Sequence, residues 1–283
     1  MIKSLSLLAI SSLLSMSALA GENPSSLDEV LAAQPEEVQA RYGARHTKET
    51  IEFFGLKPGM TVMEALPGGG WYSKILIPYL GSEGHLIGAD YAEDMYPRFG
   101  FFAQEELDKK KTWVVDWTAE ASAWIEEGGA TVSAFQLGSM PDEMKETADA
   151  VFLVRALHNL ARFEPEGEYL TKAVEDSFNV LKPGGVLGVV QHKARDEMPD
   201  DWANGSRGYL KESFVIETLE NAGFVLEASS DMNNNAADQP TTDDIVWRLP
   251  PTLATSRENE ELKAEMTAIG ESNRMTLRFR KPE

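Results

Sequence analysis

The sequence contains no cysteine and only four histidines among its 283 residues. Without cysteine the chain can form no disulfide, supply no thiolate nucleophile and build no zinc site on thiolate ligands. An oxidising compartment would still be tolerated, because no thiol is present to react there.

Positive charge is scarce as well. The chain has 26 lysines and arginines against 46 aspartates and glutamates, which gives a formal net charge of −20. A strongly acidic surface repels nucleic acid phosphates and anionic lipid headgroups, so we expect no nucleic acid partner and no membrane-surface partner. The hydrophobic content of 42% is ample for a core, and the length suits one α/β domain with embellishments.

Long apolar runs are absent outside the first twenty residues. There, Lys3 precedes an apolar segment over 4–17 that is rich in Leu, Ile, Ala and Ser, followed by Ala18-Leu19-Ala20. This layout predicts a secretory signal peptide over 1–20, cleaved after Ala20, and a periplasmic or secreted protein. The alternative is an N-terminal membrane anchor, although the segment is short for a span and serines interrupt it. Because no cysteine follows the cleavage site, we expect no lipid attachment and no stable membrane anchor after cleavage.

The most informative stretch runs from Val62 to Tyr72, where an apolar strand meets the turn Pro67-Gly68-Gly69-Gly70 and then a helix pattern. Glycine lets the backbone come close to a ligand, and the following helix points its free N–H groups into the same space. A second short strand, 85–90, ends in Asp90, whose carboxylate can accept hydrogen bonds from ribose hydroxyls. Turn and acid together favour a nucleotide-type ligand over an ordinary strand-to-helix turn.

Helix and strand patterns alternate along the rest of the chain. Helices are predicted at 27–42 with a break at Pro35, and at 47–54, 101–127, 167–181 and 211–222; further strands are predicted at 131–137, 148–154, 186–190, 224–228 and 275–280. This order predicts an α/β fold with a doubly wound, mostly parallel seven-stranded sheet and an antiparallel C-terminal strand. The alternation of 275–280 indicates an edge strand. We expect a helical extension over 21–46 and one domain over 47–283, with an insertion at about 229–273.

Three tryptophans, Trp113, Trp117 and Trp124, lie within the predicted helix 101–127. They fit either an aromatic wall for a ligand or the packing of a long helix, and their helical spacing favours packing.

Several motifs resemble, in order from about 55 to 191, those of the class I S-adenosylmethionine-dependent methyltransferases. They are Glu64-Ala-Leu-Pro-Gly-Gly-Gly, the acid Asp90, Asp149-Ala-Val-Phe-Leu-Val-Arg-Ala-Leu-His-Asn-Leu and Val180-Leu-Lys-Pro-Gly-Gly-Val-Leu-Gly-Val-Val. The stretches 245–253 and 268–277 further resemble a group of signal-bearing predicted methyltransferases of bacteria. The resemblance implies a Rossmann-like methyltransferase fold, S-adenosylmethionine as cofactor and a methylation reaction.

The resemblance also assigns residues to the cofactor. It implies that Gly68 and Gly70 admit the methionine end, that Asp90 holds the ribose hydroxyls and that Tyr91 lies against the adenine. The remaining turn residues implied at the cofactor are Glu64, Pro67, Gly69 and Trp71. The sequence departs from the family at Leu66, where the first glycine is usual, and at Gly138-Ser139, where an acid often meets the adenine amino group.

Methyl transfer from a sulfonium is an in-line displacement, which needs a base only if the acceptor must lose a proton. His158 lies just beyond the fourth strand and His192 at the end of the fifth, so both are expected at the carboxyl edge of the sheet. With Arg155 and Asn159 they are the candidate catalytic residues, although each histidine fits a purely structural hydrogen bond equally well. A metal site of His158, His192 and Glu64 lacks the usual ligand spacing, and we expect none.

The segment 229–273 is long for a connection between two paired strands. It suggests a lid or substrate wall over the cleft, or a surface decoration. Two functions stay open: an exported methyltransferase that acts on a small-molecule or envelope acceptor, and a non-catalytic exported protein that binds a nucleoside-like or other metabolite in the same cleft.

Overall fold

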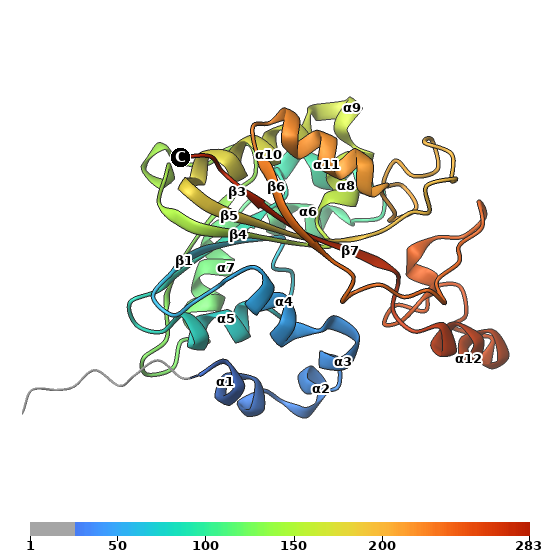
Figure 1. The fold of residues 1–283 in the computed structure, drawn as a ribbon, viewed down its shortest axis with the longest axis horizontal. Coiled ribbons are helices and arrows are strands. Elements are labelled where there is room, and N and C mark those ends of the chain that lie inside the picture. The colour runs from blue at the N-terminus through green and yellow to red at the C-terminus, as the bar shows by residue number, and fades with distance from the viewer. Residues whose placement is uncertain (1–25) are drawn as a thin grey trace, which may run out of the picture.

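The computed structural model of the chain describes residues 26–283 (Figure 1). The predicted signal peptide over 1–20 lies outside the described residues, and so do residues 21–25. Among the residues described, no helix is both long enough and apolar enough to cross a membrane.

A seven-stranded sheet forms the centre of the molecule, in the order β3-β2-β1-β4-β5-β7-β6. The pairs among β1 to β5 are parallel, and β7 is antiparallel to both of its neighbours. This confirms the predicted doubly wound sheet with its antiparallel C-terminal strand. The strands are β1 Thr61–Ala65, β2 His85–Asp90, β3 Thr131–Gln136, β4 Ala148–Val154, β5 Leu181–His192, β6 Val225–Ser230 and β7 Arg274–Arg280.

The predicted edge position of the last strand is wrong. β7 lies between β5 and β6, and the edge strand is β6, along which exposed and half-buried residues alternate. The polar residues of β7 indicated a solvent face in the sequence, but Arg274 and Thr276 are buried. The insertion covers them: Asn233, for example, donates from Nδ2 to the Thr276 hydroxyl at 2.8 Å. A polar residue in a strand thus marks a buried hydrogen bond here rather than exposure.

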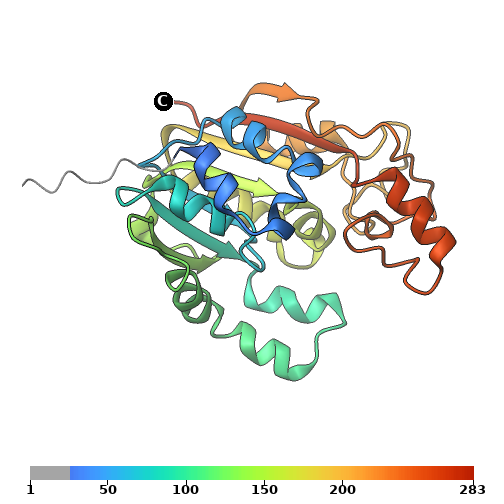
Figure 2. The same ribbon diagram turned by 90° about the horizontal axis from the view of Figure 1, so that it is seen from below.

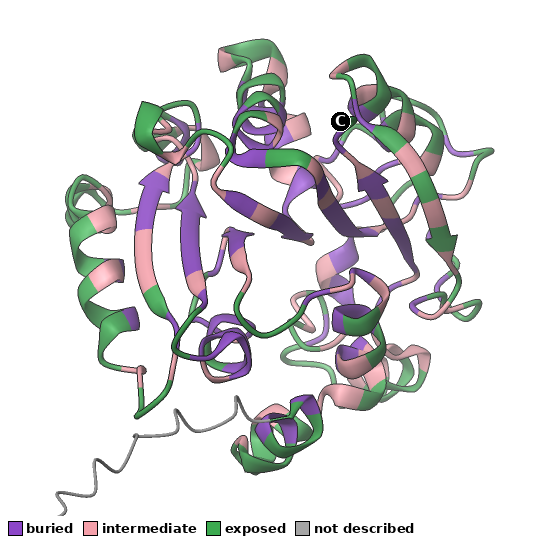
Figure 3. Ribbon diagram, turned by 60° about the vertical axis from the view of Figure 1, so that its left-hand side comes forward, coloured by how far each residue is buried: buried purple, intermediate pink, exposed green. Residues whose placement is uncertain are grey.

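Helices cover both faces of the sheet, with one hydrophobic core on each side. Helices α8, α10 and α11 pack on one face, and α1, α4, α5 and α7 on the other, as Figures 1 and 2 show. The central strands are almost wholly buried (Figure 3). The helices are α1 Leu27–Ala33, α2 Glu36–Gln39, α3 Tyr42–Arg45, α4 Thr47–Phe53, α5 Ser73–Leu80, α6 Gln104–Lys110, α7 Trp113–Ser122, α8 Leu157–Arg162, α9 Glu164–Gly167, α10 Tyr169–Val180, α11 Glu212–Asn221 and α12 Glu260–Ile269; the 3-10 turns are Glu93–Phe99, Asp142–Met144 and Val246–Arg248.

Two of the predicted helices are divided in the structure. The helix predicted over 27–42 is divided at Pro35 into α1 and α2, as predicted, and again before α3, and the helix predicted over 101–127 consists of α6 and α7. The second division falls at Thr112, whose backbone is not helical (φ −105°, ψ 7°) and whose hydroxyl lies 2.6 Å from an Asp116 carboxylate oxygen and 3.3 Å from the Lys109 carbonyl. A threonine that bonds its own backbone neighbourhood competes with helix continuation. Helix α8, which directly follows β4, was not predicted.

The insertion 229–273, which includes α12, forms a lobe at one end of the sheet (Figure 1) and is tied to the domain by buried hydrogen bonds. Asp238, which is buried, holds it in place by accepting hydrogen bonds from Arg248 at 2.8 Å, from the Tyr209 hydroxyl at 3.0 Å and from the Asn273 backbone at 2.9 Å. A buried carboxylate needs such partners to compensate for its lost hydration. The insertion therefore lies in a defined position beside the carboxyl edge of the sheet.

Candidate functional site

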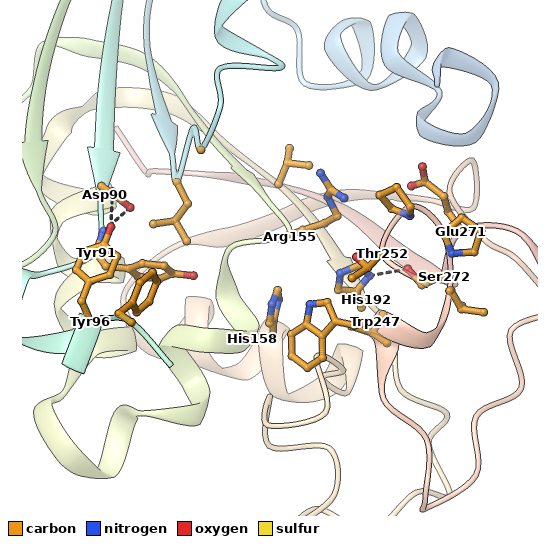
Figure 4. Close-up of a pocket in the computed structure, with 18 of the residues that line it drawn as sticks. Asp90, Tyr91, Tyr96, Arg155, His158, His192, Trp247, Thr252, Glu271 and Ser272 are labelled. Carbon is orange, nitrogen blue, oxygen red and sulfur yellow. Dashed lines mark hydrogen bonds between the residues drawn. The ribbon is translucent and has the colours of Figure 1, made fainter. Parts of the chain in front are cut away.

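A cavity of about 490 Å³ opens at the carboxyl edge of the parallel strands. Figure 4 shows residues from the ends of β2, β4 and β5 facing residues of the insertion across it. Such crevices at the carboxyl ends of strands are the usual ligand sites of doubly wound sheets. The lining consists of Leu66, Gly68, Asp90, Tyr91, Tyr96, Phe102, Lys110, Trp113, Val154, Arg155, His158, His192, Val246, Trp247, Leu249, Pro250, Pro251, Thr252, Glu271 and Ser272.

Asp90 lies at one end of the cavity, at the end of β2. Its Oδ1 accepts from the Tyr91 backbone N–H at 2.9 Å, and its Oδ2 accepts from the Tyr96 hydroxyl and lies 3.8 Å from Lys110 Nζ. Burial raises the pKa of Asp90, while Tyr96 and Lys110 oppose that shift. The aromatic residues Tyr91, Tyr96, Phe102 and Trp113 line the same cavity and supply flat apolar surfaces.

The turn after β1 borders the same end of the cavity. Leu66, which replaces the expected glycine, has a φ of 55°, and its N–H donates to the Ala89 carbonyl at 2.6 Å. A leucine in this left-handed region is strained, and the strained residue lies at the cavity wall. Gly68 also lines the cavity, and a side chain there would meet only the Leu66 carbonyl, at 4.0 Å. The turn thus leaves an approach to the backbone at Gly68.

Other turn residues assigned to the cofactor face away from the cavity. A Cβ at Gly70 would lie 2.4 Å from the Trp124 ring, so this glycine makes room for a tryptophan rather than for a ligand. Trp71 packs against Tyr42 and under the Arg45 guanidinium, 4.0 Å from its ring centroid. Glu64 is buried beneath the turn, and Ser73 donates to it at 2.6 Å. Pro67 and Gly69 likewise do not contribute to the lining.

The three tryptophans, for which the sequence suggested either an aromatic ligand wall or helix packing, have different positions in the structure. Trp117 is buried in the core under β2, as the packing interpretation predicts, whereas Trp113 stacks on it and lines the cavity. Trp124 packs on the Gly70 turn. The helical spacing alone did not separate these roles, because the break at Thr112 turns the start of α7 toward the cavity.

Arg155 is the first residue after β4, just as Leu66 is the first residue after β1. It too has a positive φ, 58°, and its N–H donates to a neighbouring strand, at the Val190 carbonyl (2.6 Å). Its side chain lines the cavity, and its Nε is buried without a hydrogen-bond partner. Figure 4 shows Arg155 between the Asp90 end and a second group of residues that includes His192, Ser272 and Glu271.

His158 and His192 lie side by side in the cavity, with ring centroids 5.4 Å apart. The Gln191 amide group donates to the Gly208 carbonyl at 3.0 Å, which leaves its oxygen to accept from His158 Nδ1 at 3.3 Å. His158 therefore carries its proton on Nδ1 and presents a free lone pair on Nε2. Burial lowers the pKa of His158 to about 4 and that of His192 well below its usual value, with Arg155 adding to both shifts. Both rings are neutral at pH 7.

Asn159, predicted beside the histidines, does not line the cavity. Its Nδ2 donates to the Tyr91 hydroxyl at 2.9 Å, so it positions the ring of Tyr91 instead of contacting a ligand. Of the candidate catalytic residues, the structure brings Arg155, His158 and His192 to the cavity. Glu64 is separate from the histidines, and no group of three or more metal-ligating side chains occurs within residues 26–283.

The insertion supplies one wall of the cavity. The Trp247 ring lies 5.9 Å from that of His158, and the Ser272 hydroxyl pairs with His192 Nδ1 at 2.5 Å. The segment from Leu249 to Thr252 completes this wall. A substrate wall was one of the two alternatives that the length of 229–273 suggested. The sequence contained no indication of Glu271 or Ser272, and the density of aromatic residues just after Asp90 was the unused signal for Tyr96 and Phe102.

Solved structures of other proteins resemble this architecture. No family model matches the chain, and no curated protein does. Among solved structures, the [4+2]-cyclase SpnF has a TM-score of 0.50 at 18% identity, over 84% of this chain and 80% of that one. A putative sarcosine dimethylglycine methyltransferase from Galdieria sulphuraria also has a TM-score of 0.50, at 13% identity, over 88% of this chain and 90% of that one. At these identities the likeness shows the fold alone, an α/β Rossmann-like methyltransferase fold.

Proposed function

We propose that this protein is an S-adenosylmethionine-dependent methyltransferase that acts on a small-molecule acceptor. The observation that carries the proposal is the cavity at the carboxyl edge of a methyltransferase-type sheet, where Asp90 on β2 and the open backbone at Gly68 border one compartment. Fold alone does not fix a reaction, as the cyclase with the same fold illustrates. The residues at this site are what favour a nucleoside-containing ligand.

The compartment around Asp90 fits S-adenosylmethionine. A carboxylate has about four acceptor positions, so Asp90 can accept from ribose hydroxyls while it keeps its bonds to Tyr91 and Tyr96. Tyr91, Phe102 and Trp113 offer flat apolar surfaces for the adenine, and Asn159 holds the Tyr91 ring in place. When bound, the cofactor supplies a methyl group on a sulfonium. The contribution of the chain is to hold the acceptor in line with that methyl group.

The two histidines suit an acceptor that is already nucleophilic. A neutral His158 with a free Nε2 can accept a hydrogen bond from the acceptor and orient it. With a pKa near 4 it is a weak base at neutral pH, so it would not remove a proton from a weakly acidic group. The neutral form of an amine, which can donate an N–H to His158 and still keeps a lone pair for the methyl group, fits this site better than an alcohol.

The proposal includes the cellular location of the protein and its resemblance to signal-bearing bacterial methyltransferases. The signal-peptide pattern over 1–20 and the resemblance to signal-bearing bacterial methyltransferases support export to the periplasm or the medium, where an envelope component would be an accessible acceptor. The insertion wall around Trp247 supports a role of 229–273 in enclosing the acceptor.

A second candidate is a non-catalytic exported protein that binds a metabolite in the same cavity. Two observations favour it. The Tyr96 hydroxyl already donates a hydrogen bond to Asp90, and Leu66 places a side chain at the cavity where the family has glycine. Both features would weaken cofactor binding.

Calorimetric titration of the mature protein, from Gly21 onward, separates the two candidates. We expect S-adenosylmethionine and S-adenosylhomocysteine to bind at micromolar strength. If neither releases heat nor shifts the melting temperature at concentrations far above that range, where mass action predicts stabilisation, the methyltransferase proposal fails and the binding protein remains.

A further inference from the structure

Arginines from three distant parts of the chain meet at the end of the cavity away from Asp90. Arg41 and Arg45 come from the N-terminal helices, Arg155 follows β4, and Arg274 begins β7. Glu271 is the acid among them, and its charge acts on Arg45, Arg155 and Arg274. Four guanidinium groups thus surround one carboxylate, in a chain whose net charge is −20.

Glu271 forms hydrogen-bonded ion pairs with two of these arginines, Arg41 and Arg274. Its Oε1 accepts from Arg41 Nε at 3.2 Å, and its Oε2 accepts from Arg274 Nη1 at 3.2 Å. Arg274 also donates from Nε to the Ser272 carbonyl at 3.2 Å and from Nη2 to the Ala44 carbonyl. Arg41, Arg274 and Glu271 therefore form a satisfied unit that carries one excess positive charge.

Arg45 and Arg155 feel the charge of Glu271 but form no hydrogen-bonded ion pair within residues 26–283. Arg45 is only 6% exposed, and its Nε and Nη1 are buried with no hydrogen-bond partner. Arg155 Nε is also buried with no hydrogen-bond partner. Trp71 supports Arg45 from one side by a cation–π contact. Burial, with Arg155 and Arg41 adding to it, lowers the pKa of Arg45 to about 9, so the group stays charged at neutral pH. Buried charge without a partner destabilises the folded protein unless a ligand supplies one.

We propose that this end of the cavity binds a carboxylate or phosphate group of the methyl acceptor, so that the acceptor is an anionic small molecule. The proposal rests on the function proposed above. Arg155 borders the cavity beside His158 and His192, with Trp247 opposite (Figure 4). An acidic group held at Arg155 would place the rest of the acceptor against these side chains, across the cavity from Asp90. Arg45 would stabilise the anion from behind by its charge.

The methionine part of the cofactor also carries a carboxylate, and it is the other source of such a group. That carboxylate comes with an ammonium, and the pair is neutral. The excess positive charge of the cluster would repel the ammonium, whereas a carboxylate or phosphate without a neighbouring cation would compensate it. Charge balance therefore favours the acceptor as the source.

The test uses inorganic phosphate as the probe, added to the mature protein at constant ionic strength without cofactor. We expect saturable thermal stabilisation, with an affinity at least tenfold weaker in Arg155→Met. Arg257→Met, which removes the same charge from an exposed part of the insertion, should leave the affinity within twofold. No saturable effect, or equal affinities in the wild type and Arg155→Met, would overturn the proposal.

A measurement on the wild type covers the case in which Arg155→Met does not fold. Since Arg155 lowers the pKa of both histidines, an anion bound to it should raise them, and NMR titration of the imidazole signals should show this rise with phosphate. Unchanged histidine titration at saturating phosphate would contradict binding at Arg155.

Repeating the phosphate titration with saturating S-adenosylhomocysteine separates the two sources. Unchanged phosphate affinity supports the acceptor, and direct competition assigns the anion site to the cofactor and overturns the proposal. Phosphate binding in a protein that binds no S-adenosylhomocysteine would instead refute the methyltransferase function, leaving an anion site in a binding protein.

Discussion

At the Asp90 end of the cavity the charged group has its partners: a backbone N–H, the Tyr96 hydroxyl and the nearby Lys110 ammonium. At the Arg155 end the guanidinium Nε has none, and Arg45 behind it lacks two. A ligand at the first end must share or displace existing hydrogen bonds, whereas a ligand at the second would satisfy groups that now have no partner. Because an unsatisfied buried donor is costly, the two ends should respond differently to the loss of one side chain.

The largest effect is expected from Asp90→Ala. If two ribose hydroxyls bond this carboxylate, each contributing about 1.5–3 kcal/mol, the affinity for S-adenosylhomocysteine should fall more than about a hundredfold. Calorimetry measures it, and phosphate binding at the other end should be unaffected. Wild-type affinity for S-adenosylhomocysteine in this variant would remove Asp90 from the cofactor site.

The next largest effect should come from Gly70→Ala, which separates packing from binding within the turn. A methyl group at this position meets the Trp124 ring at 2.4 Å, and the backbone has a φ of 77°. We expect a loss of about 2–4 kcal/mol in the free energy of unfolding, measured by denaturant titration. Gly69→Ala is the matched control, because nothing lies within 4 Å of its added carbon. Equal stability of the two variants would show that Trp124 does not constrain the turn.

Glu64→Gln should change the pH dependence of stability without affecting either end of the cavity. Burial raises the pKa of Glu64 to about 7, against an ordinary value near 4.5, although Ser73 opposes the shift. The folded state therefore holds this proton more tightly than the unfolded state, and that stabilisation is lost as pH rises from about 4.5 through 7. Relative to wild type, the variant should gain about 2 kcal/mol between pH 5 and pH 8.

Melting temperatures across this pH range measure the effect of Glu64→Gln, with the exposed Glu126→Gln as control. The gain should be the same with and without S-adenosylhomocysteine, because Glu64 faces away from the cavity. A gain that disappears on ligand binding would place Glu64 in the site after all.

The smallest effect is expected from Tyr96→Phe, which keeps the aromatic ring and removes the hydroxyl on Asp90. If this hydroxyl competes with the ribose, affinity for S-adenosylhomocysteine should rise about fivefold, equivalent to about 1 kcal/mol. Unchanged or weaker binding would mean that Asp90 serves both partners without competition.

The same contrast explains which parts of the site the sequence predicted. Asp90, Tyr91 and Gly68 follow strand ends directly, and strand ends in a doubly wound sheet share one edge, so local patterns were sufficient. His158 and His192 were placed by the same rule. The structure places Gly70 against Trp124 and Trp71 under Arg45, outside the cavity lining, and a motif does not specify which way such a turn residue faces.

The Arg155 end shows the limit of such reasoning. Arg155 itself was predicted, but its setting depends on Arg45, Glu271 and Arg274, which come together only when β7 takes its place. The alternating pattern of β7 correctly predicted a strand. It did not predict the position of that strand in the sheet, because buried polar residues such as Thr276 have the same spacing as exposed ones.

The interior position of β7 has a consequence for how the protein folds. β7 pairs with β5 on one side and with β6 on the other, and Arg274 is its first residue. Until β7 is in place, β5 has a free side, β6 has no partner in the sheet and Glu271 lacks its hydrogen bond from Arg274. Residues 193–273 separate β5 from β7, and such long-range pairing forms slowly. The sheet is therefore completed late in folding.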